Sequence, residues 1–342
     1  MKQRLFVTLS LAGLAMATFG ATKPKAAIKS LNKATVQQPT YTEWHDLQVN
    51  AINRFPLHTN FFTYPADDWV SEKDGKIVSN DILHMNKTES KYFLSLEGTW
   101  KFNWVANADQ RPTDFYKEDL DDSKWKTMNV PGNWEMNGFG DPEYVNVGFG
   151  WRGHFDQQPP AVPTKDNHVG SYRRIIDIPA NWDGKQVVAH FGSVTSNIYL
   201  YVNGKFAGYA EESKVAAEFD ITPYLKKGKN LIAFQTFRWC DGSWDEDQDF
   251  WRLSGVARES YLFARDAQLH LEDIRVTPDL VNNYKDGVLN ISTKVKGNGK
   301  LVFTLFDKDG KQVATTTGVA KNGTANFSLQ VANPQKWSAE TP

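Results

Sequence analysis

From Tyr92 onward the chain consists of short runs of alternating apolar and polar residues, separated by turn signals, with very little helical periodicity. The segment GTWKFNWV, residues 98–105, places its aromatic residues on one face, as a half-buried strand requires. The segment NIYLYVNGKFAGYA carries Asn203-Gly204 between alternating residues, and this dipeptide is the strongest short-range signal for a β-hairpin. Short strands at this spacing are typical of β-sandwiches and barrels, so the sequence predicts an all-β protein.

Two sandwich domains are predicted, at residues 91–265 and 266–342. Near the end of the first, the apolar run Leu231–Phe237 follows a Lys-Gly turn and is long enough for a central strand. Beyond Arg265 the aromatic residues thin out, Asp309-Gly310 marks a further hairpin, and five or six strands are expected, as in an immunoglobulin-like sandwich. Because the sequence stops soon after NPQKWSAE, we expect this second sandwich to be truncated, with an exposed edge.

The first 90 residues divide into three predicted segments. Residues 1–17 place basic residues before an apolar run that ends in Ala-Met-Ala, the pattern of a cleaved secretory signal peptide. Residues 18–40 are polar and predict a flexible lead-in. Residues 41–90 hold too many aromatic residues for a disordered linker, so we expect an extended segment that wraps over a domain surface. The mature protein is therefore expected to be soluble and either periplasmic or secreted.

Charge and hydropathy exclude two classes of partner. The 39 Lys and Arg residues and 40 Asp and Glu residues are mixed along the chain, so no basic stripe is present and we expect no nucleic-acid partner. Beyond the first segment, no apolar run approaches the ~20 residues that span a bilayer, so we expect no membrane span. Cys240 is the single cysteine, which excludes an intrachain disulfide, and we expect a small semi-buried side chain at a strand end.

The stretch RWCDGSWDEDQDFWRLSG, Arg238–Gly255, sets five carboxylates among four aromatic rings. Aromatic rings stack on the C–H face of a pyranose and carboxylates accept hydrogen bonds from its hydroxyls, so this composition favours sugar recognition. Neighbouring acids repel one another, which means that Arg238, Arg252 or a bound cation must compensate some of them. A pair of glycosidase carboxylates is also compatible with the sequence, whereas the calcium-loop pattern is not met.

A second stretch, Val130–Phe155, is rich in Gly, Pro and Asn and predicts a long loop, a kind of segment that often carries function. Asn133, Asn137 and Asn146 are candidate partners of sugar hydroxyls, although Asn in loops also caps its own backbone. Most of the 12 Trp residues are expected in cores, and Trp251 is the candidate sugar-stacking ring. The sequence lacks the common zinc, nucleophile-elbow and phosphate-loop motifs.

These stretches make the chain resemble glycoside hydrolase family two, and within it the β-galactosidases. The matching segments are LEGTWKFNW at 96–104, VPGNWEMNGFGDPEYVNV at 130–147, PPAVPTKDNHVGSYRR at 159–174, VNGKFAGYAEESKVAAEFDIT at 202–222 and DGSWDEDQDFWRLSG at 241–255. The resemblance covers roughly residues 44–342. It implies that the first sandwich, residues 91–265, is a jelly-roll, galactose-binding-like domain.

The resemblance also implies roles for two side chains. Asn146 and Asp249 would bind galactosyl hydroxyls, and Asp249 would also ligate sodium, a hard cation that accepts oxygen donors. The remaining acids of the stretch would brace the loop: Asp241, Asp245, Glu246 and Asp247. Departures from the family pattern at Gly148-Phe149-Gly150 and at Ala161 leave the fine specificity of the pocket open. The family's catalytic glutamates lie on a TIM barrel beyond residue 342, so no catalytic residue is expected in this chain, and the missing barrel is an expected partner.

Three functions follow as hypotheses. The first is the N-terminal part of an exported, retaining β-galactosidase that hydrolyses terminal β-D-galactosides through a galactosyl-enzyme intermediate and is inactive as this chain alone. The second is a free-standing carbohydrate-binding module. The third is a structural piece that docks onto a separately encoded barrel chain. The natural galactoside, a magnesium requirement of the complete enzyme and assembly into a homo-oligomer stay open at this level.

Overall fold

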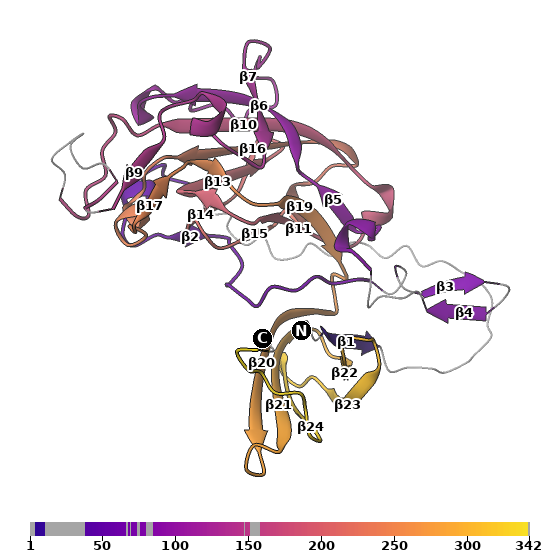
Figure 1. The fold of residues 1–342 in the computed structure, drawn as a ribbon. Coiled ribbons are helices and arrows are strands. Elements are labelled where there is room, and N and C mark those ends of the chain that lie inside the picture. The colour runs from indigo at the N-terminus through magenta and orange to yellow at the C-terminus, as the bar shows by residue number, and fades with distance from the viewer. Residues whose placement is uncertain are drawn as a thin grey trace, which may run out of the picture. The chain divides into compact units, whose positions relative to one another are not determined.

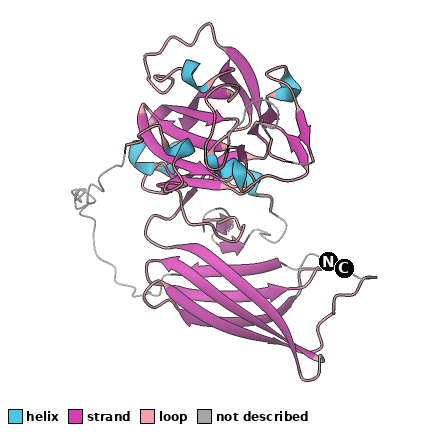
Figure 2. Cartoon of the chain, turned by 90° about the vertical axis from the view of Figure 1, so that its left-hand side faces the viewer, coloured by secondary structure: helices cyan, strands magenta, loops and turns pink. Residues whose placement is uncertain are grey.

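The computed structural model describes residues 4–10, 38–65, 68, 70–73, 76–79, 85–146, 148–150 and 158–340. They form two compact units (Figure 1). The first sandwich comprises Asn32–Leu57 and Tyr92–Ala264, and the second comprises Met1–Leu31, His58–Lys91 and Arg265–Pro342. Strands dominate both units, and helical turns are short (Figure 2), which confirms the all-β prediction.

Short 3-10 turns connect many of the strands. They are η1 (Glu43–His45), η2 (Lys87–Glu89), η3 (Ala108–Gln110), η4 (Glu135–Asn137), η5 (Ala180–Trp182), η6 (Thr222–Tyr224) and η7 (Asp241–Trp244). Within the described ranges, no helix is long and apolar enough to cross a membrane.

The first sandwich is built from two large sheets and two small ones. Its strands are β2 (Ala51–Ile52), β5 (Phe93–Ser95), β6 (Gly98–Val105), β7 (Lys126–Val130), β8 (Gly132–Asn133), β9 (Glu143–Val145), β10 (Val169–Ile178), β11 (Gln186–Phe191), β12 (Val194–Thr195), β13 (Asn197–Val202), β14 (Lys205–Glu211), β15 (Ala217–Asp220), β16 (Gly228–Phe237), β17 (Phe250–Arg252), β18 (Gly255–Val256) and β19 (Ser260–Arg265). A seven-stranded sheet runs β2-β14-β13-β16-β10-β6-β7, and a four-stranded sheet runs β15-β11-β19-β5. The small sheets are β12-β18-β8 and the ribbon β17-β9. This arrangement is a jelly-roll sandwich, as the resemblance implied.

Both faces of the seven-stranded sheet are buried, because its central strands carry apolar residues at successive positions. On β13, Leu200 packs into one hydrophobic cluster while Tyr199 and Tyr201 pack into another. Successive side chains of a strand point to opposite faces, so the two clusters lie on opposite sides of the sheet. The hairpin between β13 and β14 turns at Asn203 and Gly204, whose φ angles of 50° and 75° are the left-handed values such a turn needs.

The cluster opposite the inter-sheet core is covered by the segment that precedes Leu57. Trp44 and Ile52 pack into this cluster, and the Trp44 ring stacks on Phe237 with 5.1 Å between centroids. The Tyr199 hydroxyl donates to Glu43 Oε2 at 3.0 Å and anchors the same segment. Burying each large side chain contributes about 1.5–3 kcal/mol, so this segment is an integral layer of the first sandwich.

The second sandwich packs two three-stranded sheets around its own core. Its strands are β1 (Arg4–Ser10), β3 (Val70–Lys73), β4 (Lys76–Ser79), β20 (His270–Val281), β21 (Asp286–Lys296), β22 (Lys300–Phe306), β23 (Gln312–Val319) and β24 (Thr324–Val331). The sheets run β20-β21-β24 and β1-β22-β23, while β3 and β4 form a separate hairpin. Five of these strands lie between residues 266 and 342, and the predicted Asp309-Gly310 hairpin joins β22 to β23.

The N-terminal predictions meet the structure only in part. Residues 4–10, inside the predicted signal peptide, form β1, whose backbone pairs with β22 from Arg4↔Phe306 to Ser10↔Lys300. Residues 11–37 lie outside the described residues, so the signal peptide and the lead-in stay predictions. The segment predicted as a single wrapping stretch, residues 41–90, is divided between the two units after Leu57.

Candidate functional site: a carboxylate ribbon

The acid-rich stretch folds as one helical turn followed by two short strands. The turn η7 spans Asp241–Trp244, and the backbone amides of Asp245 and Glu246 both donate to the carbonyl of Gly242, at 3.1 and 3.0 Å. The carboxylates that follow face different surroundings. Asp245 and Asp249 are exposed, whereas Glu246 and Asp247 are half-buried and Asp241 is buried.

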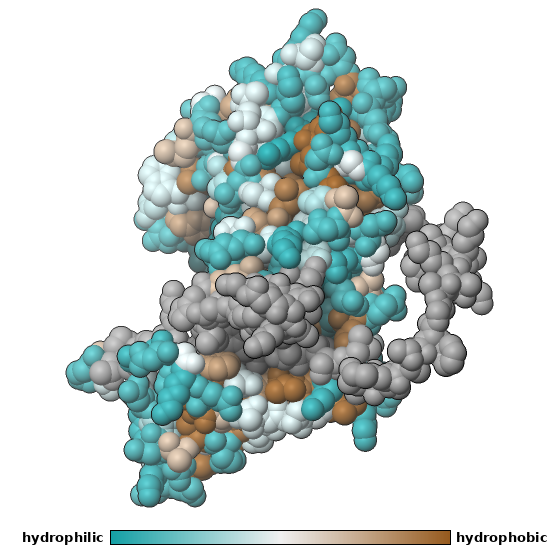
Figure 3. Space-filling model, turned by 90° about the vertical axis from the view of Figure 1, so that its right-hand side faces the viewer, coloured by the Kyte–Doolittle hydropathy of each residue, from teal (hydrophilic) through white to brown (hydrophobic). Residues whose placement is uncertain are grey.

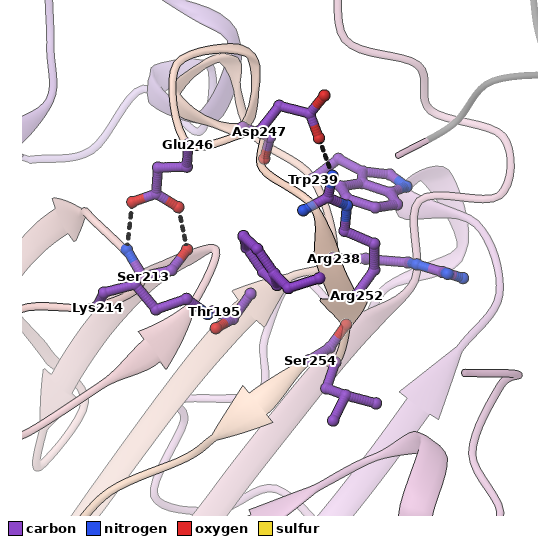
Figure 4. A pocket seen from close by; sticks show the side chains of 12 residues that line it. Thr195, Ser213, Lys214, Arg238, Trp239, Glu246, Asp247, Arg252 and Ser254 are labelled. Carbon is purple, nitrogen blue, oxygen red and sulfur yellow. Dashed lines mark hydrogen bonds and ion pairs between the residues drawn. The ribbon is translucent and has the colours of Figure 1, made fainter. Parts of the chain in front are cut away.

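Two of the acids brace the loop, as the sequence predicts. Glu246 accepts hydrogen bonds from the backbone amide of Ser213 at 2.6 Å and from its hydroxyl. Asp247 forms an ion pair with Arg252. The other candidate brace, Arg238, instead donates to Glu143 Oε2 at 2.9 Å, so it holds the neighbouring loop rather than an acid of its own stretch. Figure 4 shows Glu246 turned toward Ser213 and Asp247 turned toward Arg252.

The two predicted sugar-binding residues are brought together by the ribbon of β9 and β17. These strands pair antiparallel from Arg252↔Glu143 to Phe250↔Val145. Asn146 follows β9 directly and Asp249 directly precedes β17, so the antiparallel pairing puts both residues at the same end of the ribbon, where the chain bends at each of them. Both residues are exposed. The structure therefore joins two stretches that lie about a hundred residues apart in the sequence.

Two exposed aromatic residues accompany these polar groups on the ribbon. Tyr144 and Trp251 are paired residues of β9 and β17, are 52% and 54% exposed, and have ring centroids 5.5 Å apart. The Tyr144 hydroxyl donates to Asp249 Oδ1 at 2.5 Å, and this hydrogen bond raises the pKa of Tyr144 and keeps it a donor. Exposed rings beside a carboxylate and an amide can bind a sugar by stacking and by hydrogen bonds to its hydroxyls.

Oxygen donors at the ribbon suit a hard cation such as sodium. Asp249 offers a carboxylate and Asn146 an amide oxygen, which are the ligand types that hard cations take. These two side chains supply only part of a coordination shell of about six oxygens, so a cation held here needs further ligands.

The other candidate asparagines serve the backbone. Asn133 lies in β8 and its amide donates to the carbonyl of Ser254 at 3.3 Å. Asn137 donates to the carbonyl of Asn133 at 2.7 Å. Asn137 therefore fits the turn-forming alternative, whereas Asn133 links two segments that lie far apart in the sequence. Cys240 is buried, and its thiol lies 3.8 Å from the carbonyl oxygen of Ser196.

A second carboxylate group was not singled out from the sequence. Glu211 at the end of β14 and Asp241 of η7 lie beside Cys240, and the potential ligand atoms of these residues are within 4.8 Å of one another. With Asp46, the two acids line a hollow in the surface of the first sandwich. Burial raises the pKa of Glu211 to about 9, and Asp241 Oδ2 has no hydrogen-bond partner among the described residues. The pair can hold a proton or a hard cation through its carboxylate oxygens. The sequence signal that could have indicated this pair is Glu211, an acid at the end of the mostly buried strand β14.

Comparison with known families agrees with this geometry. The model described as "Glycosyl hydrolases family 2, sugar binding domain" matches residues 93–266, and the model "Glycosyl hydrolases family 2" matches residues 269–342. The first match alone spans more than half of the chain. The chain therefore belongs to glycosyl hydrolases family 2, which confirms the resemblance at the level of the family.

Curated relatives point the same way. The β-galactosidase of Priestia megaterium is 35% identical over 315 residues, which are 88% of this chain and 29% of the relative. The β-galactosidase of Halalkalibacterium halodurans is 36% identical over 87% of this chain and 28% of its own length. The β-galactosidase large subunit of Leuconostoc lactis is 31% identical over 87% of this chain and 47% of its own length. The chain thus spans less than half of each of these relatives.

Solved structures share the fold at lower identity. A glycosyl hydrolase family 2 member from Bacteroides cellulosilyticus matches with a TM-score of 0.54 at 22% identity, covering 73% of this chain and 33% of that one. A β-glucuronidase from Bifidobacterium dentium, complexed with coumarin-3-O-glucuronide, matches with a TM-score of 0.56 at 16% identity, covering 74% of this chain and 44% of that one. At these identities the likeness shows the fold alone.

Proposed function

We propose that this chain is the sugar-binding N-terminal part of an exported, retaining β-galactosidase that hydrolyses terminal β-D-galactosides. The observation that carries the proposal is the ribbon of β9 and β17, which brings Asn146 and Asp249 to the same end, beside two exposed aromatic rings. Three curated relatives named as β-galactosidases share 31%, 35% and 36% identity with the chain and are longer than it. The acid/base and nucleophile of the reaction would then belong to a part of the enzyme beyond these domains, and the chain alone would be inactive.

Within this proposal Asn146 and Asp249 bind galactosyl hydroxyls, and Asp249 also ligates sodium. A carboxylate that accepts one hydrogen bond from Tyr144 keeps further lone pairs for a hydroxyl or a cation. The buried pair of Glu211 and Asp241 offers carboxylate oxygens, the ligands that magnesium and other hard cations take. Export rests on the signal-peptide pattern of residues 1–17.

The test compares two substitutions in the full-length enzyme, Asp249→Asn and Asp245→Asn. Both remove one exposed carboxylate from the same loop, so Asp245→Asn is the matched control. Hydrolysis of an aryl β-galactoside is followed while sodium replaces potassium at constant ionic strength. A hydrogen bond to a charged group contributes about 1.5–3 kcal/mol, so Asp249→Asn should lower kcat/KM by roughly tenfold to a hundredfold and abolish the sodium response. Unchanged kinetics across the sodium titration would remove Asp249 from the site.

A free-standing carbohydrate-binding module is the second candidate function, because the exposed pair of Tyr144 and Trp251 also suits binding without catalysis. Aryl β-galactoside hydrolysis by residues 18–342, alone and mixed with a complementary barrel fragment, distinguishes the two. Activity only in the mixture supports the β-galactosidase, whereas galactoside binding by the chain alone with no gain from the barrel supports the module. Activity of the chain alone would mean that its own carboxylates perform the reaction.

A further inference from the structure

A small pocket of about 40 Å³ lies beneath the acid-rich loop of the first sandwich, and no step of the proposed function uses it. Its cationic lining consists of Lys214, Arg238 and Arg252. Thr195 of β12, labelled in Figure 4, also lines the pocket, as does Phe250 of β17. We call it the cationic pocket. Most of its lining belongs to the stretch 238–254, and Thr195, Ser213 and Lys214 close it from two other segments.

Both carboxylates that line this pocket already have partners. Both oxygens of Glu246 accept hydrogen bonds from Ser213, and Asp247 is paired with Arg252. By contrast, Lys214 forms no ion pair among the residues that the structure describes. An ammonium carries three donors and a guanidinium five, so the lining holds more N–H donors than its own acceptors can satisfy.

Three buried donors in the lining lack partners. Arg238 and Arg252 are 6% and 7% exposed, and in both the Nε atom has no hydrogen-bond partner among the described residues. The buried hydroxyl of Thr195 also has no hydrogen-bond partner among the described residues. Buried polar atoms are nearly always paired, so three orphaned donors around one pocket indicate a small acceptor that completes them.

Aromatic contacts hold two of the cations in place. The Lys214 ammonium lies 5.1 Å and the Arg252 guanidinium 4.5 Å from the centroid of the Phe250 ring. A ring that is shared by two cations orients them without neutralising their charge. Arg238 and Arg252 are each paired with a carboxylate, so Lys214 is the lining cation that forms no ion pair among the described residues, and it favours a negative charge over water.

We propose that the cationic pocket binds a small anion, of the size range from chloride to phosphate, through Lys214, Arg252 and the Thr195 hydroxyl. The anion accepts charge-assisted hydrogen bonds and ties β12 and the segment after β14 to the loop that carries Asp249. This inference is independent of the galactosidase proposal, because it concerns binding by this chain and does not require a reaction.

The test is thermal unfolding of the purified chain at constant ionic strength. Potassium chloride or potassium phosphate replaces potassium gluconate, whose anion is larger. A ligand that binds only the folded state stabilises it in proportion to its occupancy, so a saturable rise in Tm of several degrees is expected. A response to chloride assigns a halide to the pocket, and a response to phosphate alone assigns an oxyanion.

Two variants and a control tie the response to this pocket. Lys214→Gln removes an exposed cation and should weaken the apparent anion affinity by about tenfold or more, the equivalent of one charge-assisted hydrogen bond. Thr195→Val removes an unpaired hydroxyl, so it should fold as well as wild type yet bind the anion more weakly. Lys227→Gln changes a lysine whose side chain is 94% exposed and should respond like wild type. A Tm that does not respond to either anion, or an equal response in Lys214→Gln and Lys227→Gln, would leave water or general screening as the explanation and overturn the proposal.

Discussion

The buried acid Glu211 gives the sharpest prediction from the structure. Burial raises its pKa from 4.5 to about 9, ahead of a hydrogen bond from Tyr209, which lowers it, and the nearby Asp241, which raises it. A group whose pKa is higher in the folded state takes up a proton on folding. Its stabilising contribution is complete below about pH 4.5 and is lost as the pH rises toward 9. The free energy of unfolding should therefore fall by about 1.4 kcal/mol per pH unit between about pH 4.5 and pH 9.

Glu211→Gln removes the titration while keeping the shape of the side chain. Between pH 6 and pH 8 the free energy of unfolding of the wild type should fall by about 2.7 kcal/mol, whereas that of Glu211→Gln should not show this fall. For a domain of this size that difference corresponds to a Tm change of roughly 5–10 °C. Thermal unfolding in EDTA at pH 6, 7 and 8 measures it. Glu118→Gln is the control, because Glu118 lies in an exposed ion pair with Lys226.

The same experiment has a second arm with magnesium in place of EDTA. A cation held by Glu211 and Asp241 favours both carboxylates in their charged forms, so it should flatten the pH dependence of the wild type. Equal slopes for wild type and Glu211→Gln in EDTA would refute the assignment of a protonated acid at this position.

Three further substitutions test the packing and the ribbon. Gly170→Ala should destabilise the chain by about 1–3 kcal/mol or more in urea unfolding, because an added Cβ would lie 2.4 Å from a Trp134 ring atom; an unchanged midpoint would show that the ring can move aside. Tyr172→Phe should cost about 1–3 kcal/mol in the same assay, since it leaves the buried Trp134 Nε1 without its acceptor at 2.6 Å, and a neutral effect would mean that water replaces the hydroxyl. If the proposed function holds, Tyr144→Phe in the full-length β-galactosidase should raise KM for an aryl β-galactoside with little change in kcat, because Asp249 loses the donor that orients it; unchanged KM would contradict that role.

Local sequence patterns predicted much of the sandwich because a hairpin turn or a strand depends mainly on residues that are close together in the sequence. The Asn203-Gly204 hairpin and the central strand at Leu231–Phe237 depend on turn chemistry and on apolar periodicity, and both are present. The strand β9 was missed inside a stretch predicted as a loop. It has only three residues, and it pairs with β17, whose sequence lies about a hundred positions later.

The site was predictable to the extent that it resembles a family, and less so from physical chemistry alone. The number of acids between Arg238 and Gly255 required compensation, and Arg252 provides it for Asp247. The pairing of Arg238 with Glu143 depends on a fold that brings two loops together, so no spacing rule could give it. The buried Glu211 was missed for the same reason, since the low dielectric that shifts its pKa exists only in the folded sandwich.

On the face seen in Figure 3, hydrophobic residues lie in separate patches among hydrophilic ones. The first sandwich keeps a second aromatic surface buried. That surface is the second face of the seven-stranded sheet, which Trp44 and Ile52 cover. A recombinant fragment that starts at Tyr92 would lack the segment that contains Trp44 and Ile52. Such a fragment would expose the part of this face around Tyr199, Tyr209 and Phe237, and an exposed aromatic patch of this kind promotes self-association. The limits of the domain match at residue 93 are therefore poor limits for expression, and a soluble version has to begin before Tyr41.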